Sequence, residues 1–174
     1  MGYETINLAE YGKLLFGSVK KGIFKEIKER IDSSKKDIFN LDLSKVKHID
    51  PEFIKVVLVA IVKYVTEKHK GRKVIFFTES KNESSWSYWL RKVFEEEELM
   101  GFVKQGDKLH IIGNAPFLRR ALIYRVPTDK WLSSQELANK LGIDLDICKP
   151  LFLEFLKMGI LRKNDEGNYQ RVVG

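Results

Sequence analysis

The stretch from Ser133 to Val173 carries the densest series of helix and turn signals in the chain. A serine at 133 or 134 can cap a helix over 135–141, and Gly142 can end that helix in a left-handed conformation. A second helix is predicted from about 146 to 158, followed by Gly159. Its inner stripe comprises Cys148, Leu151, Phe152, Phe155 and Leu156. A turn over 164–168 between two short strands then predicts a hairpin.

Another helix is predicted over 116–124, with Pro127 as its limit. The residues expected to face inward are Phe117, Leu118, Ala121 and Leu122. The run Glu136-Leu137-Ala138-Asn139-Lys140-Leu141-Gly142-Ile143 resembles the first helix and turn of helix-turn-helix proteins. Helix, helix-turn-helix and hairpin in this order resemble the winged helix-turn-helix module. We therefore expect such a domain over residues 114–174.

This resemblance implies contact with double-stranded DNA, although the expected recognition helix has few base-reading side chains. Asp144 and Asp146 would repel phosphates, and Pro150 removes a backbone donor and is tolerable only in the first helical turn. Exposed Leu153 would instead suit a protein partner. We therefore predict DNA contacts mainly with the sugar–phosphate backbone, although an ordinary solvated surface explains the same cations equally well. The candidate DNA-binding residues are Arg119, Arg120, Lys149, Lys157, Arg162, Lys163 and Arg171.

Residues before 114 alternate between strand and helix patterns, which predicts an α/β layer. Strands are expected over 13–16, 38–43, 73–78 and 109–112, and the first is expected to pair with 5–8. Helices are expected over 19–31 and 53–69, and from Ser84 or Ser85 onward. The last of these has an apolar stripe that indicates core packing rather than a base-stacking platform. The stripe comprises Trp86, Trp89, Leu90, Val93 and Phe94.

The segment Phe39-Asn40-Leu41-Asp42-Leu43-Ser44-Lys45-Val46-Lys47-His48-Ile49-Asp50 is similar to the strand, "DLS" and "ID" run of STAS-type domains. These domains have the fold of bacterial anti-sigma-factor antagonists. The resemblance covers about residues 12–101 and implies a STAS-like mixed sheet with helices over residues 1–113. It also implies that this domain senses a protein partner or an effector.

One feature of the antagonists is missing from this segment. Where they carry a phosphorylatable Ser or Thr just after the aspartate, this chain has Pro51 and Glu52, which puts switching by phosphorylation in doubt. Asp50 can instead cap a helix that has Pro51 as its first residue. His48, Asp50 and Glu52 form the candidate partner- or ligand-binding loop.

Composition restricts the compartment and the class of protein. A charged fraction of 32% and an apolar fraction of 44% are typical of a soluble globular chain. The longest apolar run, 56–62, is too short to cross a bilayer, and the first residues do not resemble a signal peptide. A single cysteine, Cys148, fits a reducing cytoplasm and excludes an internal disulfide. The net charge of +7 permits nucleic-acid binding without demonstrating it.

An enzyme requires converging catalytic groups, and the sequence has no Walker loop, GxSxG or HExxH motif. Asp42, His48 and Asp50 are the only cluster to test for nucleotide or metal binding. The sequence therefore predicts a non-enzymatic, cytoplasmic transcriptional regulator without a cofactor or a metal. The alternative is a protein-interaction adaptor of the anti-sigma-factor-antagonist type that does not bind DNA. Homodimer formation stays open, because no heptad pattern marks an interface.

Overall fold

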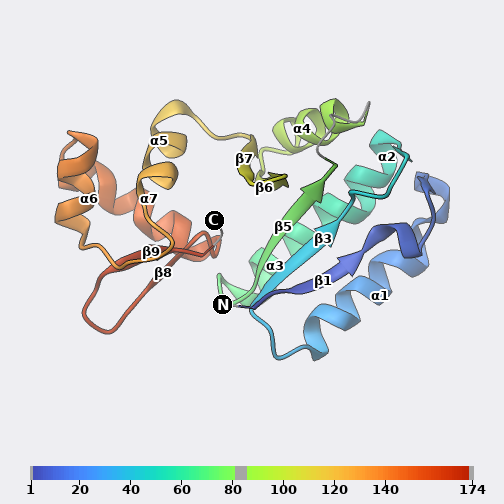
Figure 1. The fold of residues 1–174 in the computed structure, drawn as a ribbon, viewed down its shortest axis with the longest axis horizontal. Coiled ribbons are helices and arrows are strands. Elements are labelled where there is room, and N and C mark those ends of the chain that lie inside the picture. The colour runs from blue at the N-terminus through green and yellow to red at the C-terminus, as the bar shows by residue number, and fades with distance from the viewer. Residues whose placement is uncertain (1, 81–85, 173–174) are drawn as a thin grey trace.

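The computed structural model of the chain describes residues 2–80 and 86–172. Its main element is a mixed sheet with the strand order β1-β3-β5-β6-β7 (Figure 1). Strands β1, β3, β5 and β6 run parallel, and β7 is antiparallel to β6. The bounds are Glu4–Asn7 for β1, Ile38–Asp42 for β3, Val74–Glu79 for β5, Met100–Gln105 for β6 and Lys108–Gly113 for β7. The predicted mixed α/β class is therefore confirmed.

Helices α1 (Lys20–Ser33), α3 (Ala60–His69) and α4 (Ser87–Glu96) supply apolar side chains to one core of this sheet. Leu41 and Phe77 contribute to that core from the strands, whereas their neighbours Ile38 and Phe76 belong to a second core. Successive strand residues point to opposite faces, so the central strands are buried on both sides. Short one-turn helices, η1 (Leu8–Glu10) and η2 (Gly17–Val19), lie between β1 and α1.

A long helix follows the loop after β3. It comprises α2 (Pro51–Phe53), a π-helical stretch η3 (Ile54–Val59) and α3. Asp50 caps it, as predicted, by accepting a hydrogen bond from the Phe53 amide at 2.6 Å. The helix ends at Lys70 and Gly71, which both have positive φ. The sequence predicted both ends of this helix but not the π-helical stretch.

The C-terminal segment comprises α5 (Phe117–Arg125), α6 (Ser134–Leu141), α7 (Leu145–Lys157) and a hairpin of β8 (Leu161–Lys163) and β9 (Tyr169–Arg171). Leu132 bridges to Tyr169 and extends the hairpin. Ser133 and Glu136 form a reciprocal capping box at the start of α6, and Gly142 ends that helix in a left-handed conformation. The predicted helices and hairpin are present in the predicted order. The inward orientation expected for Phe117 and Leu118 concerns side chains outside those that the structure describes.

The second core joins the C-terminal segment to the sheet. It combines strand residues such as Val74, Phe76 and Phe102 with Leu122, Phe152 and other residues of the C-terminal helices. Two glycines lie where the turns after α3 and α7 approach each other. A Cβ at Gly71 would lie 2.0 Å from the Leu156 carbonyl oxygen, and one at Gly159 would lie 2.6 Å from a Val74 methyl carbon. The turn after α3 and the turn after α7 therefore meet backbone to backbone, which only glycine permits.

Several sequence-based expectations about the α/β part are wrong. The predicted strand near residue 14 is β2 (Leu14–Leu15), but it pairs in parallel with β4 (His48–Ile49) rather than with β1. Strand β6 was not predicted, because Gly101 and the polar residues at its end interrupt the apolar pattern. Trp89 lies at the margin of the α4 stripe and is 39% exposed, with Lys92 over its ring. The expected helix start at Ser84 or Ser85 lies outside the described residues. Within the described ranges, no helix is both long and apolar enough to cross a bilayer.

Asp32, near the end of α1, ties this helix to α3. Its carboxylate accepts hydrogen bonds from the Tyr64 hydroxyl at 2.6 Å and from Lys68 Nζ at 2.8 Å, and His69 Nε2 lies 3.1 Å away. Partial burial raises the pKa of Asp32, but these hydrogen bonds outweigh it and lower the pKa to about 2. The ionised carboxylate is therefore the form that stabilises the contact between the helices.

We expect Asp32→Asn to lower the free energy of unfolding at neutral pH by about 1 kcal/mol, after allowance for partial solvent screening. A depressed carboxyl pKa stabilises the folded state above the unfolded pKa of about 4, and this contribution is lost as the pH falls towards about 2. Urea unfolding at several pH values measures the difference between the wild-type protein and the variant. A difference that does not shrink between about pH 4 and about pH 2 would contradict this role.

Candidate functional site

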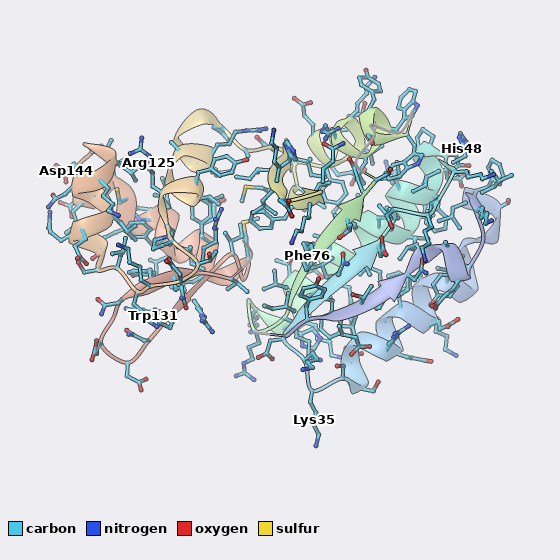
Figure 2. All side chains as sticks on the ribbon, in the orientation of Figure 1. Lys35, His48, Phe76, Arg125, Trp131 and Asp144 are labelled. Carbon is cyan, nitrogen blue, oxygen red and sulfur yellow. The ribbon has the colours of Figure 1, made fainter. Side chains whose placement is uncertain are left out.

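The predicted partner loop lies at one end of the molecule, and the C-terminal segment, which carries the predicted DNA-binding residues, lies towards the other. Figure 2 labels His48 of the loop before α2 at one end, and Asp144 and Arg125 of the C-terminal segment at the other. The two sets therefore do not form one site.

The outer face of α7 is apolar at its centre. Ile147 and Leu153 are 54% and 58% exposed, and Pro150 is exposed between them. The opposite face of the helix is buried through Cys148, Phe152 and other residues. A DNA recognition helix presents hydrogen-bond donors and acceptors at such positions, whereas here three of them present only carbon. Exposed Leu153 was predicted. Ile147 was missed, although its three-residue spacing from Pro150 places it on the same side.

The expectation that Pro150 is tolerated only in the first turn of α7 is wrong. The helix begins at Leu145, because Asp144 caps it by accepting a hydrogen bond from the Asp146 amide at 2.9 Å. Pro150 therefore lies inside the helix, where it cannot donate to the Asp146 carbonyl. Asp146 and Pro150 are both exposed, so water can donate a hydrogen bond to the Asp146 carbonyl oxygen.

Three of the predicted DNA-binding cations, those on α5 and at position 149 of α7, make ion pairs or hydrogen bonds within the protein. Arg119 lies 3.1 Å from Glu154 of α7 in an ion pair. Arg120 donates to the main-chain carbonyls of Ala115 and Ile111, at 2.7 and 3.0 Å, and so ties α5 to the end of β7. Lys149 pairs with Asp146 at 2.9 Å. Because of these contacts, Arg119, Arg120 and Lys149 are less available to bind a phosphate.

The remaining predicted cations belong to the hairpin and to the end of α7. Lys157 and Lys163 are exposed, and no carboxylate among the described residues lies within ion-pair distance of either. Arg162 is half-buried and lies over the Trp131 ring at 5.0 Å. Burial lowers the pKa of the Arg171 guanidinium, whose Nε has no hydrogen-bond partner among the described atoms. The tip of the hairpin is acidic, because its exposed residues include Asp165 and Glu166.

In the predicted partner loop, Asp50 has a structural role. Besides capping α2, its two carboxylate oxygens each accept from the Gly17 amide at 3.1 Å. A Cβ at Gly17 would lie 2.5 Å from the Glu52 side chain, so this contact brings the loop after β2 against the start of α2. Asp50 is therefore occupied by two backbone segments rather than presented to a ligand.

The exposed residues around this loop include apolar and aromatic side chains. Leu14 and Phe16 are 55% and 41% exposed, and the Phe16 ring lies 5.6 Å from the ring of exposed His48. The parallel pairing of β2 with β4 brings Leu14 opposite His48. Sequence reasoning named His48 but missed Leu14 and Phe16, because it paired their strand with β1.

Searches for similar proteins found no family model that matches the chain and no curated protein with a significant match. Among the described residues, no group of three or more His, Cys, Asp or Glu side chains could hold a metal ion. Assignment of a function therefore depends on the two surfaces described above.

Proposed function

We propose that the chain is a non-enzymatic regulatory protein in which a STAS-like domain over residues 1–113 is joined to a winged helix-turn-helix domain over 114–174. In this proposal, the winged-helix domain contacts a protein partner through the outer face of α7, and the loop around His48 serves as a second contact for a partner. The order of α5, Leu132, α6, α7 and the hairpin supports the winged-helix assignment. The parallel order β1-β3-β5 with helices on one face supports the STAS-like assignment.

The exposed apolar centre of α7 is the observation that carries this proposal. Ile147, Pro150 and Leu153 form an apolar patch, and exposed Lys157, one turn beyond Leu153, adds a positive charge at its edge. A protein interface combines an apolar centre with a polar rim, whereas a DNA interface needs donors at that centre. The positive charge of Lys157 favours a partner whose apolar groove has an acidic residue at its edge.

A photo-crosslinking amino acid placed at position 153 of the full chain in cells tests this proposal. We expect a discrete protein adduct, since the residue at this position would lie inside the interface. The matched control is the same substitution at Glu29, which is exposed on α1, away from both proposed contacts. Adding Ile147→Glu should remove the adduct at 153 without changing the thermal stability. Adducts of equal yield at 153 and 29, or adducts that a nuclease removes, would count against the proposal.

The exposed lysines Lys157 and Lys163 favour a second candidate, a transcriptional regulator that binds the DNA backbone. On this candidate, random duplex DNA binds at low salt, and its affinity falls as salt is added. Lys157→Ala with Lys163→Ala should then make the slope of log affinity against log salt shallower by about 2. Fluorescence anisotropy measures this slope, and Lys45→Ala with Lys47→Ala is the matched control. The absence of binding at low salt would exclude this candidate.

A further inference from the structure

A basic groove of about 460 Å³ lies where the α/β part meets the hairpin. Four cations line it, from three places in the chain: Lys35 and Lys36 after α1, Arg72 after α3, and Arg162 on β8. Asp37 is the single acidic residue of the lining. Figure 2 shows Lys35 projecting into solvent from its loop. The groove is separate from the outer face of α7 and from the loop around His48.

Arg162 is held in a fixed orientation at this groove. Its Nε donates to Gln170 Oε1 at 2.9 Å, its Nη2 donates to the same oxygen, and its guanidinium lies over the Trp131 ring. Gln170 is buried, and its own amide nitrogen donates to the Thr128 carbonyl at 2.7 Å. The guanidinium has no carboxylate partner among the described residues. An arginine that is oriented by neutral groups retains its charge and its Nη1 donors for an anion.

The two lysines are carried by a loop with a fixed backbone. Ser34 donates to Glu4 Oε2 at 2.6 Å and accepts from the Lys36 amide at 3.1 Å. Lys73 Nζ donates to the Ser34 carbonyl at 2.8 Å and so ties the loop to β5. The loop that carries Lys35 and Lys36 is therefore fixed at the edge of the groove, although their long side chains remain exposed.

We infer that this groove binds the phosphate groups of a nucleotide. Four cations against one carboxylate favour an anion with more than one negative charge. The volume lies in the range of small-molecule sites. Asp37 can accept a hydrogen bond from a sugar hydroxyl, which inorganic polyphosphate lacks. Because Arg162 belongs to the hairpin and Lys35, Lys36 and Arg72 to the α/β part, the bound nucleotide bridges the two parts and stabilises their contact.

Calorimetric titration of the full chain with ATP and with inorganic tripolyphosphate tests this inference. We expect both to bind at one site per chain, with ATP the tighter ligand. Lys35→Ala with Lys36→Ala should weaken both by about tenfold or more, because each charge-assisted hydrogen bond contributes about that factor. The matched control, Lys45→Ala with Lys47→Ala, removes the same charge from the other end of the α/β part and should leave both affinities unchanged. Asp37→Ala should remove the preference for ATP.

Three results would overturn the inference. The first is that neither probe binds. The second is that the two double variants weaken binding equally, which would indicate nonspecific attraction to a basic protein. The third is that duplex DNA of equal phosphate concentration binds while ATP does not, which would assign the groove to a nucleic-acid backbone. The inference does not depend on the proposed partner contact of α7, and the lysine variants leave that face intact.

Discussion

Gly71→Ala should lower the free energy of unfolding by about 3 kcal/mol or more, a large loss for a single added methyl group. A Cβ at position 71 would lie 2.0 Å from the Leu156 carbonyl oxygen, and φ there is +84°. The clash is with main chain at the end of α7, so no side-chain rotation relieves it. The left-handed backbone adds a smaller penalty, of about 1 kcal/mol. Urea unfolding followed by tryptophan fluorescence and by circular dichroism measures the total.

Gly142→Ala is the matched control for this prediction. Gly142 also has a left-handed backbone, with φ at +65°, but a Cβ there meets nothing within 4 Å. The free energy of unfolding of this variant should therefore fall only by the cost of placing alanine in a left-handed backbone, about 1 kcal/mol. The difference between the two variants isolates the contact between the turn after α3 and the turn after α7. Equal losses in Gly71→Ala and Gly142→Ala would show that the two turns do not meet as described.

Local signals in the sequence predicted the helix ends of the fold. Asp50 and Ser133 have side chains that accept from amides three residues ahead, and Gly142 adopts a conformation that other residues disfavour. Such interactions extend over a single turn, so their residues are close in the sequence. The same holds for the hairpin turn, where the Asn164 side chain accepts from the Asn168 amide at 2.8 Å.

Contacts between distant segments could not be predicted in this way. The continuous apolar run of β3 indicated burial on both faces, but nothing local indicates that the face with Ile38 would meet the C-terminal helices. The same limit applies to charge. Arg120 has the sequence context of a surface cation, yet it donates to two carbonyls because α5 begins beside the end of β7. The basic groove was missed for this reason, since its four cations come from three separate places in the chain.

Asp50→Ala should lower the free energy of unfolding by about 3 kcal/mol, because it removes two different contacts. Loss of the helix cap accounts for about 1 to 2 kcal/mol, and loss of the hydrogen bonds from the Gly17 amide to a charged acceptor accounts for the rest. Asp50→Asn keeps an oxygen that can cap α2, so it should lose only about 1 kcal/mol. Chemical denaturation of the two variants measures both values.

The comparison between these two variants also tests whether the Asp50 carboxylate is available to bind a partner or ligand. If Asp50 holds Gly17 and Phe53, as its distances of 3.1 and 2.6 Å indicate, then its carboxylate is not available to a ligand. In the proposed function, the contact with a partner at this end of the molecule would then be made by exposed residues such as Phe16 and His48. Equal stability of Asp50→Ala and Asp50→Asn would contradict the double contact. In that case Asp50 would again be a candidate for direct contact with a partner or ligand.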